Sequence, residues 1–256
     1  GRAAPVMKPL PEGTRILEAD AERTFKNPLL RQDMVGMLFR VADGDYHQGL
    51  GYLAAFLRLM LPEAETLAIL WTLSSDSKTY IHGYWKAKPE AFARDAMLFE
   101  RLLTERMPKI ALVLRSAGVV PEAYAQKYFC GLCIHVLPFG PLCVFIERFL
   151  QGGWRYLLKF ALALVSTLEP KIQAVTAGDS SALLSLLRLD RNLFVDSEKE
   201  PFGAILAAAD AVELGADDLL LGMREEESVK LQAKLEAVRA REAEMRKEDE
   251  DDDDSY

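Results

Sequence analysis

Apolar residues recur along most of this 256-residue chain at spacings of three and four, the period that places side chains on one face of an α-helix. In one such run, Leu50, Leu53 and Leu57 share a single stripe. Stretches in which apolar and β-branched residues alternate with polar ones, as in half-buried strands, do not occur in the sequence. The pattern predicts an all-α fold built from many helices.

Clusters of glycine, proline, serine and aspartate interrupt this pattern and are typical of turns between helices. They lie at residues 43–45, 74–77, 118–121, 151–153, 176–181 and 196–201. A further break at Met107-Pro108 predicts a boundary between two lobes near residues 104–108. The sequence has no repeat of fixed period, which argues against a solenoid.

The last part of the chain is rich in charged residues. From about Arg224, oppositely charged residues stand four apart, as in Glu226-Lys230 and Glu242-Arg246, and such pairs stabilise a solvated helix. An unbroken acidic run follows at residues 248–254, and we expect it to be a disordered tail. The chain is therefore divided into an extension at 1–14, a helical domain at 15–227, and a charged helix with an acidic tail at 228–256.

The charge of the chain is concentrated in this tail. Seven acids lie in residues 248–254, so the net charge of −8 falls to −1 when they are set aside. A nucleic-acid-binding domain usually carries a basic face, and none is indicated here. No segment reaches the roughly 18 to 20 consecutive apolar residues that span a bilayer. We expect no nucleic-acid partner, and membrane contact only through a partner protein.

Cysteine is sparse. Cys130 and Cys133 form one C-x-x-C, and Cys143 is the only other cysteine. A tetrahedral zinc site needs four ligands, and His135 is not regularly spaced with these thiols. The C-x-x-C lies in an apolar run that we predict to be helical, where small buried thiols are common. We expect buried thiols, no metal site and a reducing, cytoplasmic compartment.

Two short motifs near the N-terminus carry the candidate chemistry. Residues 17–25 read L-x-x-D-x-x-R-T-F, with Asp20 and Arg23 at the fixed positions, and residues 46–49 read Y-x-Q-G. In this order on a helical chain, the two motifs resemble the finger motifs of TBC domains, the GTPase-activating modules for Rab-type small G proteins. Residues 15–227 follow the order of that family throughout. The resemblance implies a two-lobed, multi-helix TBC-like domain.

The resemblance also assigns roles to five residues. Arg23 would be the arginine finger and Gln48 the glutamine finger, both catalytic, and Asp20 the acid that supports the arginine. Tyr46 would orient the loop that bears Gln48, and Gly49 would allow the partner's backbone to approach closely. An arginine supplied in trans stabilises the phosphoryl-transfer transition state, and a glutamine amide can position the attacking water.

Such an activator completes the active site of its partner and has no substrate pocket of its own. GTP and Mg²⁺ would be bound by the partner, a Rab-type small GTPase, and the chain itself would need no cofactor. Consistently, the sequence contains no phosphate-binding G-x-x-x-x-G-K-[ST] loop. Its oligomeric state does not follow from the sequence.

The sequence departs from the family at several places, among them Leu17 where relatives usually carry isoleucine, a shorter stretch between the two motifs, and an opening helix that we expect to be missing. Relatives usually read Q-G-M-N, whereas Gly51 stands here in place of the asparagine. In the third motif, Gly140, Val144, Ile146 and Glu147 stand where the family tends to carry Glu, Arg, Trp and Asp. Two readings besides an activator therefore stay open: a catalytically weak module that binds a GTPase or scaffolds a complex, and a helical adaptor that works through its charged C-terminal helix.

Overall fold

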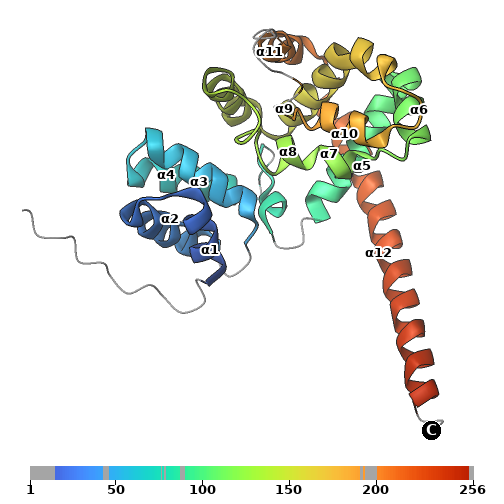
Figure 1. Cartoon of the computed structure of the whole chain (residues 1–256), viewed down its shortest axis with the longest axis horizontal. Helices are drawn as coiled ribbons and strands as arrows, with labels where there is room; N and C mark the ends of the chain where they lie inside the picture. Colours follow the sequence, from blue (N-terminus) through green and yellow to red (C-terminus); the bar gives the residue numbers. More distant parts are fainter. Residues whose placement is uncertain are drawn as a thin grey trace, which may run out of the picture.

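The computed structural model describes residues 15–42, 46–75, 77, 79–86, 90–190, 193 and 201–253. Within these ranges the chain forms 12 α-helices and one short 3-10 helix, and no strand (Figure 1). The predicted all-α fold is confirmed. The predicted extension at 1–14, the turn at 43–45 and most of the break at 196–201 lie outside the described residues.

The first lobe contains α1 to α4, drawn in blue to cyan in Figure 1. Their bounds are Arg15–Thr24, Pro28–Val41, Gln48–Met60 and Glu63–Leu73. The start of α2 shows how local sequence sets a boundary: the Asn27 side chain accepts a hydrogen bond from the Leu29 N–H at 2.9 Å, and Pro28 occupies the first turn. The buried stripe of α3 includes Leu50, Leu53 and Leu57, as the apolar spacing predicts.

The second lobe contains the remaining α-helices. They are α5 (Glu90–Arg106), α6 (Pro108–Ser116), α7 (Pro121–Tyr124), α8 (Gln126–Phe129), α9 (Phe139–Ala174), α10 (Ser180–Leu187), α11 (Pro201–Ala211) and α12 (Asp217–Asp253). The 3-10 helix η1 (His82–Trp85) packs against both α3 and α5 and so connects the lobes.

The lobe boundary therefore precedes α5, and the boundary predicted at residues 104–108 is wrong. Met107-Pro108 is a corner between α5 and α6, which pack against each other within the second lobe. Pro108 begins α6 because its ring is compatible with the first turn of a helix but not with the interior of one. A proline break marks the end of a helix and does not reveal whether the next helix packs on the same lobe.

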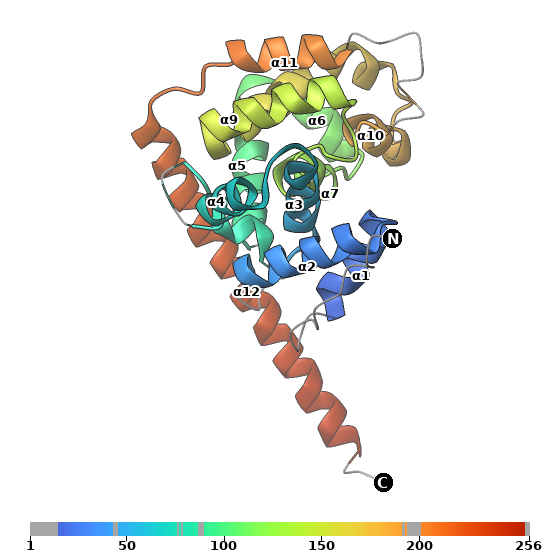
Figure 2. The ribbon, with the colours of Figure 1, turned by 90° about the vertical axis from the view of Figure 1, so that its left-hand side faces the viewer.

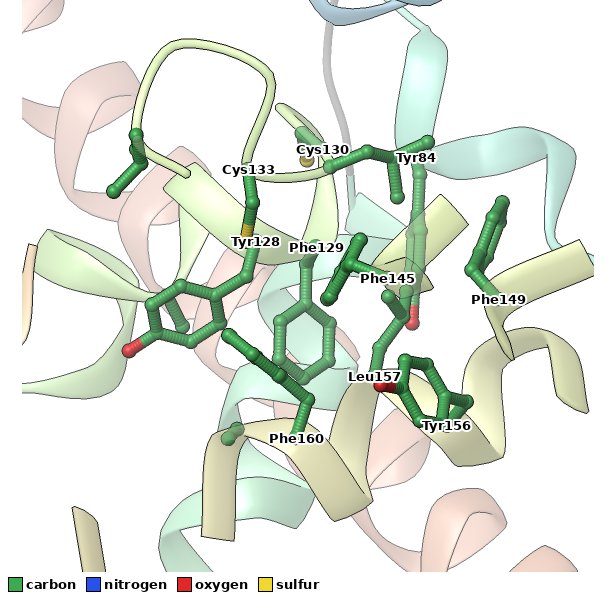
Figure 3. Packing of buried hydrophobic residues seen from close by; sticks show 14 of the residues in the cluster. Tyr84, Tyr128, Phe129, Cys130, Cys133, Phe145, Phe149, Tyr156, Leu157 and Phe160 are labelled. Atoms are coloured by element: carbon green, nitrogen blue, oxygen red, sulfur yellow. The ribbon is translucent and has the colours of Figure 1, made fainter. Parts of the chain in front are cut away.

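The core of the second lobe is rich in aromatic rings. Phe145 and Phe160 stack edge to face with ring centroids 4.8 Å apart, and Tyr128 packs on Phe160 at 5.8 Å (Figure 3). The long helix α9, which carries two of these rings, changes direction at Gly153, whose φ is 56°. A side chain there would collide with the Thr79 carbonyl, so the predicted break at 151–153 is a glycine-dependent kink.

Cys130 and Cys133 are both buried in this core, as predicted, but they are not helical (Figure 3). They lie in a turn after α8, in which Leu132 and Cys133 both have positive φ. An apolar run cannot distinguish a buried helix from a buried turn, which is why the helical prediction fails. Burial raises the pKa of Cys130 to about 12, so its thiol stays protonated at neutral pH.

Helix α12 runs along the second lobe and then projects away from it (Figures 1 and 2). Arg224 of this helix binds the buried carboxylate of Asp95 in α5 through two hydrogen bonds of 2.8 Å. The helix continues to Asp253. In the described part of the chain, no helix combines the length and apolarity needed to cross a membrane.

Candidate functional site

The five residues singled out in the sequence line a single cavity of about 480 Å³. Asp20 and Arg23 come from α1, Gln48 and Gly49 from the start of α3, and Tyr46 from the segment just before α3. The opposite wall comes from the second lobe, through α8 and the turn that follows it. The structure therefore brings together two motifs that are separated by about twenty residues in the sequence.

Asp20 is the centre of this arrangement. Its carboxylate is almost fully buried and accepts hydrogen bonds from three side chains. Oδ1 pairs with the Arg23 guanidinium and accepts from Gln48 Nε2 at 3.3 Å. Oδ2 accepts from the Tyr46 hydroxyl at 3.0 Å. A buried carboxylate needs such donors, because burial removes its hydration.

The two candidate finger side chains differ in exposure. The Arg23 side chain is 68% exposed although it pairs with Asp20, so most of its donor surface faces solvent. Gln48 is half-buried at the first position of α3. A guanidinium offers five donors, so Arg23 can keep one bond to Asp20 and still bind another acceptor. The site can thus present a permanent cation and an amide at one opening.

Helix α3 is capped by His47, a residue to which the sequence assigns no role. Its Nδ1 accepts a hydrogen bond from the Gly49 N–H at 3.0 Å, which requires that nitrogen to be unprotonated. Burial lowers the pKa of His47, and the charge of Asp20 opposes that shift. A neutral His47 therefore holds the first turn of α3, and with it Gln48, in place.

Gly49 lies against the second lobe of its own chain. It is buried, and a Cβ atom at this position would lie closer than 3.0 Å to the carbonyl oxygen of Cys130 in the same chain. That oxygen also accepts a hydrogen bond from the Trp85 indole at 3.0 Å. The close approach that Gly49 permits within this chain is thus between α3 and the second lobe, and its role toward a partner's backbone stays a prediction.

The wall from the second lobe adds residues that sequence reasoning did not identify. The exposed residues Gln126 and Lys127 belong to α8, and the ring of His135 meets that of Tyr52 edge to face at 4.0 Å. No motif marks these positions, because they join the site only through the packing of the two lobes. Lys127 adds a second cation to the lining, in which Asp20 is the one carboxylate among the described residues.

Across the described residues, no group of three or more His, Cys, Asp or Glu side chains is arranged to hold a metal ion. The donors in the cavity are instead suited to anionic or polar acceptors: one guanidinium, one ammonium and the amides of Gln48 and Gln126. The arrangement can therefore stabilise negative charge that is brought to its opening.

The chain resembles known proteins in sequence. Carabin from Mus musculus is 31% identical over 140 residues, which make up 55% of this chain and 31% of that protein. TBC1 domain family member whacked from Drosophila melanogaster is 27% identical over 148 residues, 57% of this chain and 40% of that protein. The chain spans less than half the length of these two relatives.

A solved structure shares the fold. The crystal structure of the Chlamydomonas flagellar RabGAP TBC domain aligns with a TM-score of 0.58 at 16% identity, covering 77% of this chain and 67% of that one. A family model described as the Rab-GTPase-TBC domain matches residues 9–173, a range that includes both motifs and the cavity they line. Because this match extends over well more than half of the sequence, the chain belongs to the Rab-GTPase-TBC domain family.

Proposed function

We propose that this chain accelerates GTP hydrolysis by a Rab-type small GTPase, and that it supplies Arg23 and Gln48 to the partner's active site. The observation that carries the proposal is the position of Asp20, which binds both side chains at the opening of one cavity. Membership of the TBC family supports a GTPase-activating role in general. The exposed cations Arg23 and Lys127 suit a partner surface that carries nucleotide phosphates.

In this mechanism the chain binds no nucleotide itself. Arg23 would stabilise the charge that develops on the transferred phosphoryl group, a contribution worth roughly 10³ to 10⁵ in rate for a trans-acting arginine. Gln48 would orient the attacking water through its amide donor and acceptor. GTP and Mg²⁺ would belong to the partner, and membrane contact would come through the partner as well. A place in vesicle trafficking follows from such a role.

The test begins with a GTP-hydrolysis screen over a panel of GTP-loaded small GTPases. With a responsive partner, we expect Arg23→Ala to lower kcat about 100-fold or more, because the trans charge is lost at the transition state. Arg23→Lys should recover little, since an ammonium cannot bind two oxygens in one plane. Gln48→Ala should also lower kcat, while binding of the GTP-loaded partner is largely kept.

Arg40 provides the matched control, because this exposed arginine of the same lobe also pairs with a carboxylate, that of Glu63, and lies outside the cavity. Arg40→Ala should leave kcat unchanged. Full activation by the Arg23→Ala variant would show that Arg23 is not a finger. Binding of a GTP-loaded partner without acceleration, for every GTPase tested, would instead support the binding or scaffolding module.

A further inference from the structure

Gly51 is the position at which this chain lacks the asparagine usual in its family, and the structure shows what occupies the space. A Cβ atom built on Gly51 would lie closer than 3.0 Å to the Tyr46 hydroxyl oxygen, a separation that real Cβ atoms essentially never show. The next atoms are more distant, with Met34 Cε at 3.1 Å and Tyr46 Cζ at 3.4 Å. The Tyr46 hydroxyl therefore sits where a side chain at position 51 would begin.

The Tyr46 hydroxyl in this position binds Asp20. It donates to Asp20 Oδ2 at 3.0 Å, and this leaves Oδ1 to accept from Arg23 and Gln48. Burial raises the pKa of Tyr46, and the charge of Asp20 raises it further, so the phenol remains a donor at neutral pH. The Tyr46 hydroxyl thus holds one oxygen of the Asp20 carboxylate, and Arg23 and Gln48 share the other oxygen as their common acceptor.

We propose that Gly51 and Tyr46 form a positioning pair. Because Gly51 has no side chain, the Tyr46 hydroxyl can occupy the space beside it, and from there the hydroxyl orients Asp20 between the two fingers. The pair thereby performs a positioning role in a chain that lacks the family's asparagine. The catalytic consequence rests on the proposed function. The seating itself does not, since it concerns the folded chain alone.

The seating is tested by a double-mutant cycle on the melting temperature of the isolated chain. Gly51→Ala should lower the melting temperature by about 2–4 °C or more, because the new methyl group must displace the hydroxyl. In the Tyr46→Phe background the clashing oxygen is gone, and only the flexible end of Met34, at 3.1 Å, must still shift, so Gly51→Ala should lower the melting temperature much less. Gly36→Ala in α2, where a Cβ meets nothing within 4 Å, reports the intrinsic effect of replacing a helical glycine.

The orientation of Asp20 is tested by kinetics with a responsive GTPase. Tyr46→Phe should lower kcat about tenfold and leave KM for the GTP-loaded partner unchanged, since the hydrogen bond that is lost lies within the chain, between Tyr46 and Asp20. Gly51→Ala should lower kcat to a similar extent. Combining the two substitutions should lower kcat no further than either alone, because both act on the same hydroxyl.

The outcomes separate the pair from the proposed function. Equal effects of Gly51→Ala in both backgrounds would overturn the seating, whether or not any GTPase is activated. The positioning role would be overturned if the cycle shows coupling between Gly51 and Tyr46 in the melting temperature but Tyr46→Phe leaves kcat unchanged. This holds for an assay in which Arg23→Ala loses activity. A harmless Arg23→Ala would count against the proposed fingers and leave the measured coupling between Gly51 and Tyr46 intact.

Discussion

Single residues decide how helix α3, which begins at Gln48, is held. Its first turn depends on two local contacts. Gly49 packs so closely on the Cys130 carbonyl that a side chain would not fit, and the His47 ring accepts a hydrogen bond from the Gly49 N–H. Neither feature touches a catalytic atom in the proposed mechanism. Both nevertheless set the position of Gln48, which lies between them in the sequence.

We expect Gly49→Ala to lower the free energy of unfolding by about 1–3 kcal/mol, the usual cost of forcing extra volume into a packed site. The Cys130 carbonyl cannot move aside easily, because it also accepts the Trp85 N–H. Urea denaturation measures the effect. Gly222→Ala is the control, since a Cβ there meets nothing within 4 Å, and it should be neutral or stabilising by up to about 1 kcal/mol. A neutral Gly49→Ala would contradict the close packing.

His47 should make stability depend on pH. Its pKa is lowered in the folded chain, so the unfolded chain binds the proton first as the pH falls. Its contribution is complete above the unfolded pKa of about 6.5 and is lost as the pH falls below that value. Asp20, which faces the ring, opposes the shift without reversing it.

His47→Asn tests this, because asparagine also caps helices but does not titrate in this range. The melting temperatures of the parent and of this variant should lie close together at pH 7.5. At pH 5.5 the parent should have lost more than the variant. An equal loss in both would mean that acid destabilisation arises from other groups.

At the scale of elements, a buried charge cluster fastens α12 to α5. Asp95 is fully buried and binds Arg224 of α12, Arg94 of its own helix and the Tyr84 hydroxyl of η1. The Arg224 guanidinium also lies 4.4 Å from the centre of the Trp154 ring, a cation–π contact. Helices α5 and α12 and η1 thus meet around one carboxylate, and α9 joins them through Trp154.

Removing that carboxylate should be costly, because it leaves two arginines without their partner in a largely buried site. We expect Asp95→Ala to lower the free energy of unfolding by about 3–5 kcal/mol, measured by urea denaturation. Arg148→Ala breaks the exposed pair with Asp210 and serves as the control, with an expected change within about 1 kcal/mol. Similar losses for the two variants would show that the buried cluster does not fasten α12 as inferred.

At the scale of the whole molecule, the two lobes and the projecting helix have different roles. The lobes meet around η1 and around the cavity that Arg23 and Gln48 line, to which both lobes contribute walls. The distal part of α12 leaves the body, and its described side chains from residue 236 to 245 are all exposed (Figure 2). Among the described residues, the lining of the cavity therefore includes none of the distal part of α12.

Removal of residues 247–256 should accordingly change neither the melting temperature nor GTPase activation, since a solvated acidic segment buries no apolar surface. Thermal unfolding and the hydrolysis assay, each against the full chain, provide the measurement. Truncation before Arg224 is the contrasting variant, because it removes the partner of Asp95 and should destabilise the fold. A large loss from the shorter deletion would indicate that the tail docks on the body.

The sequence alone determined the features that depend on neighbours along the chain. The spacing of apolar residues set the helices, and the predicted break at 151–153 marked the kink in α9. The two motifs, together with the order of the rest of the chain, indicated the family that the family model then matched over residues 9–173. These features are readable because φ preference and amphipathic spacing act within a few residues.

Only the tertiary structure decided which of these elements meet. It moved the lobe boundary to the segment before α5, placed Cys130 in a turn against Gly49, and added Lys127 to the cavity. It also showed that one carboxylate, Asp20, joins two motifs and that the Tyr46 hydroxyl fills the space above Gly51. Such contacts join residues that are distant in sequence. They depend on how whole helices pack, which no local pattern encodes.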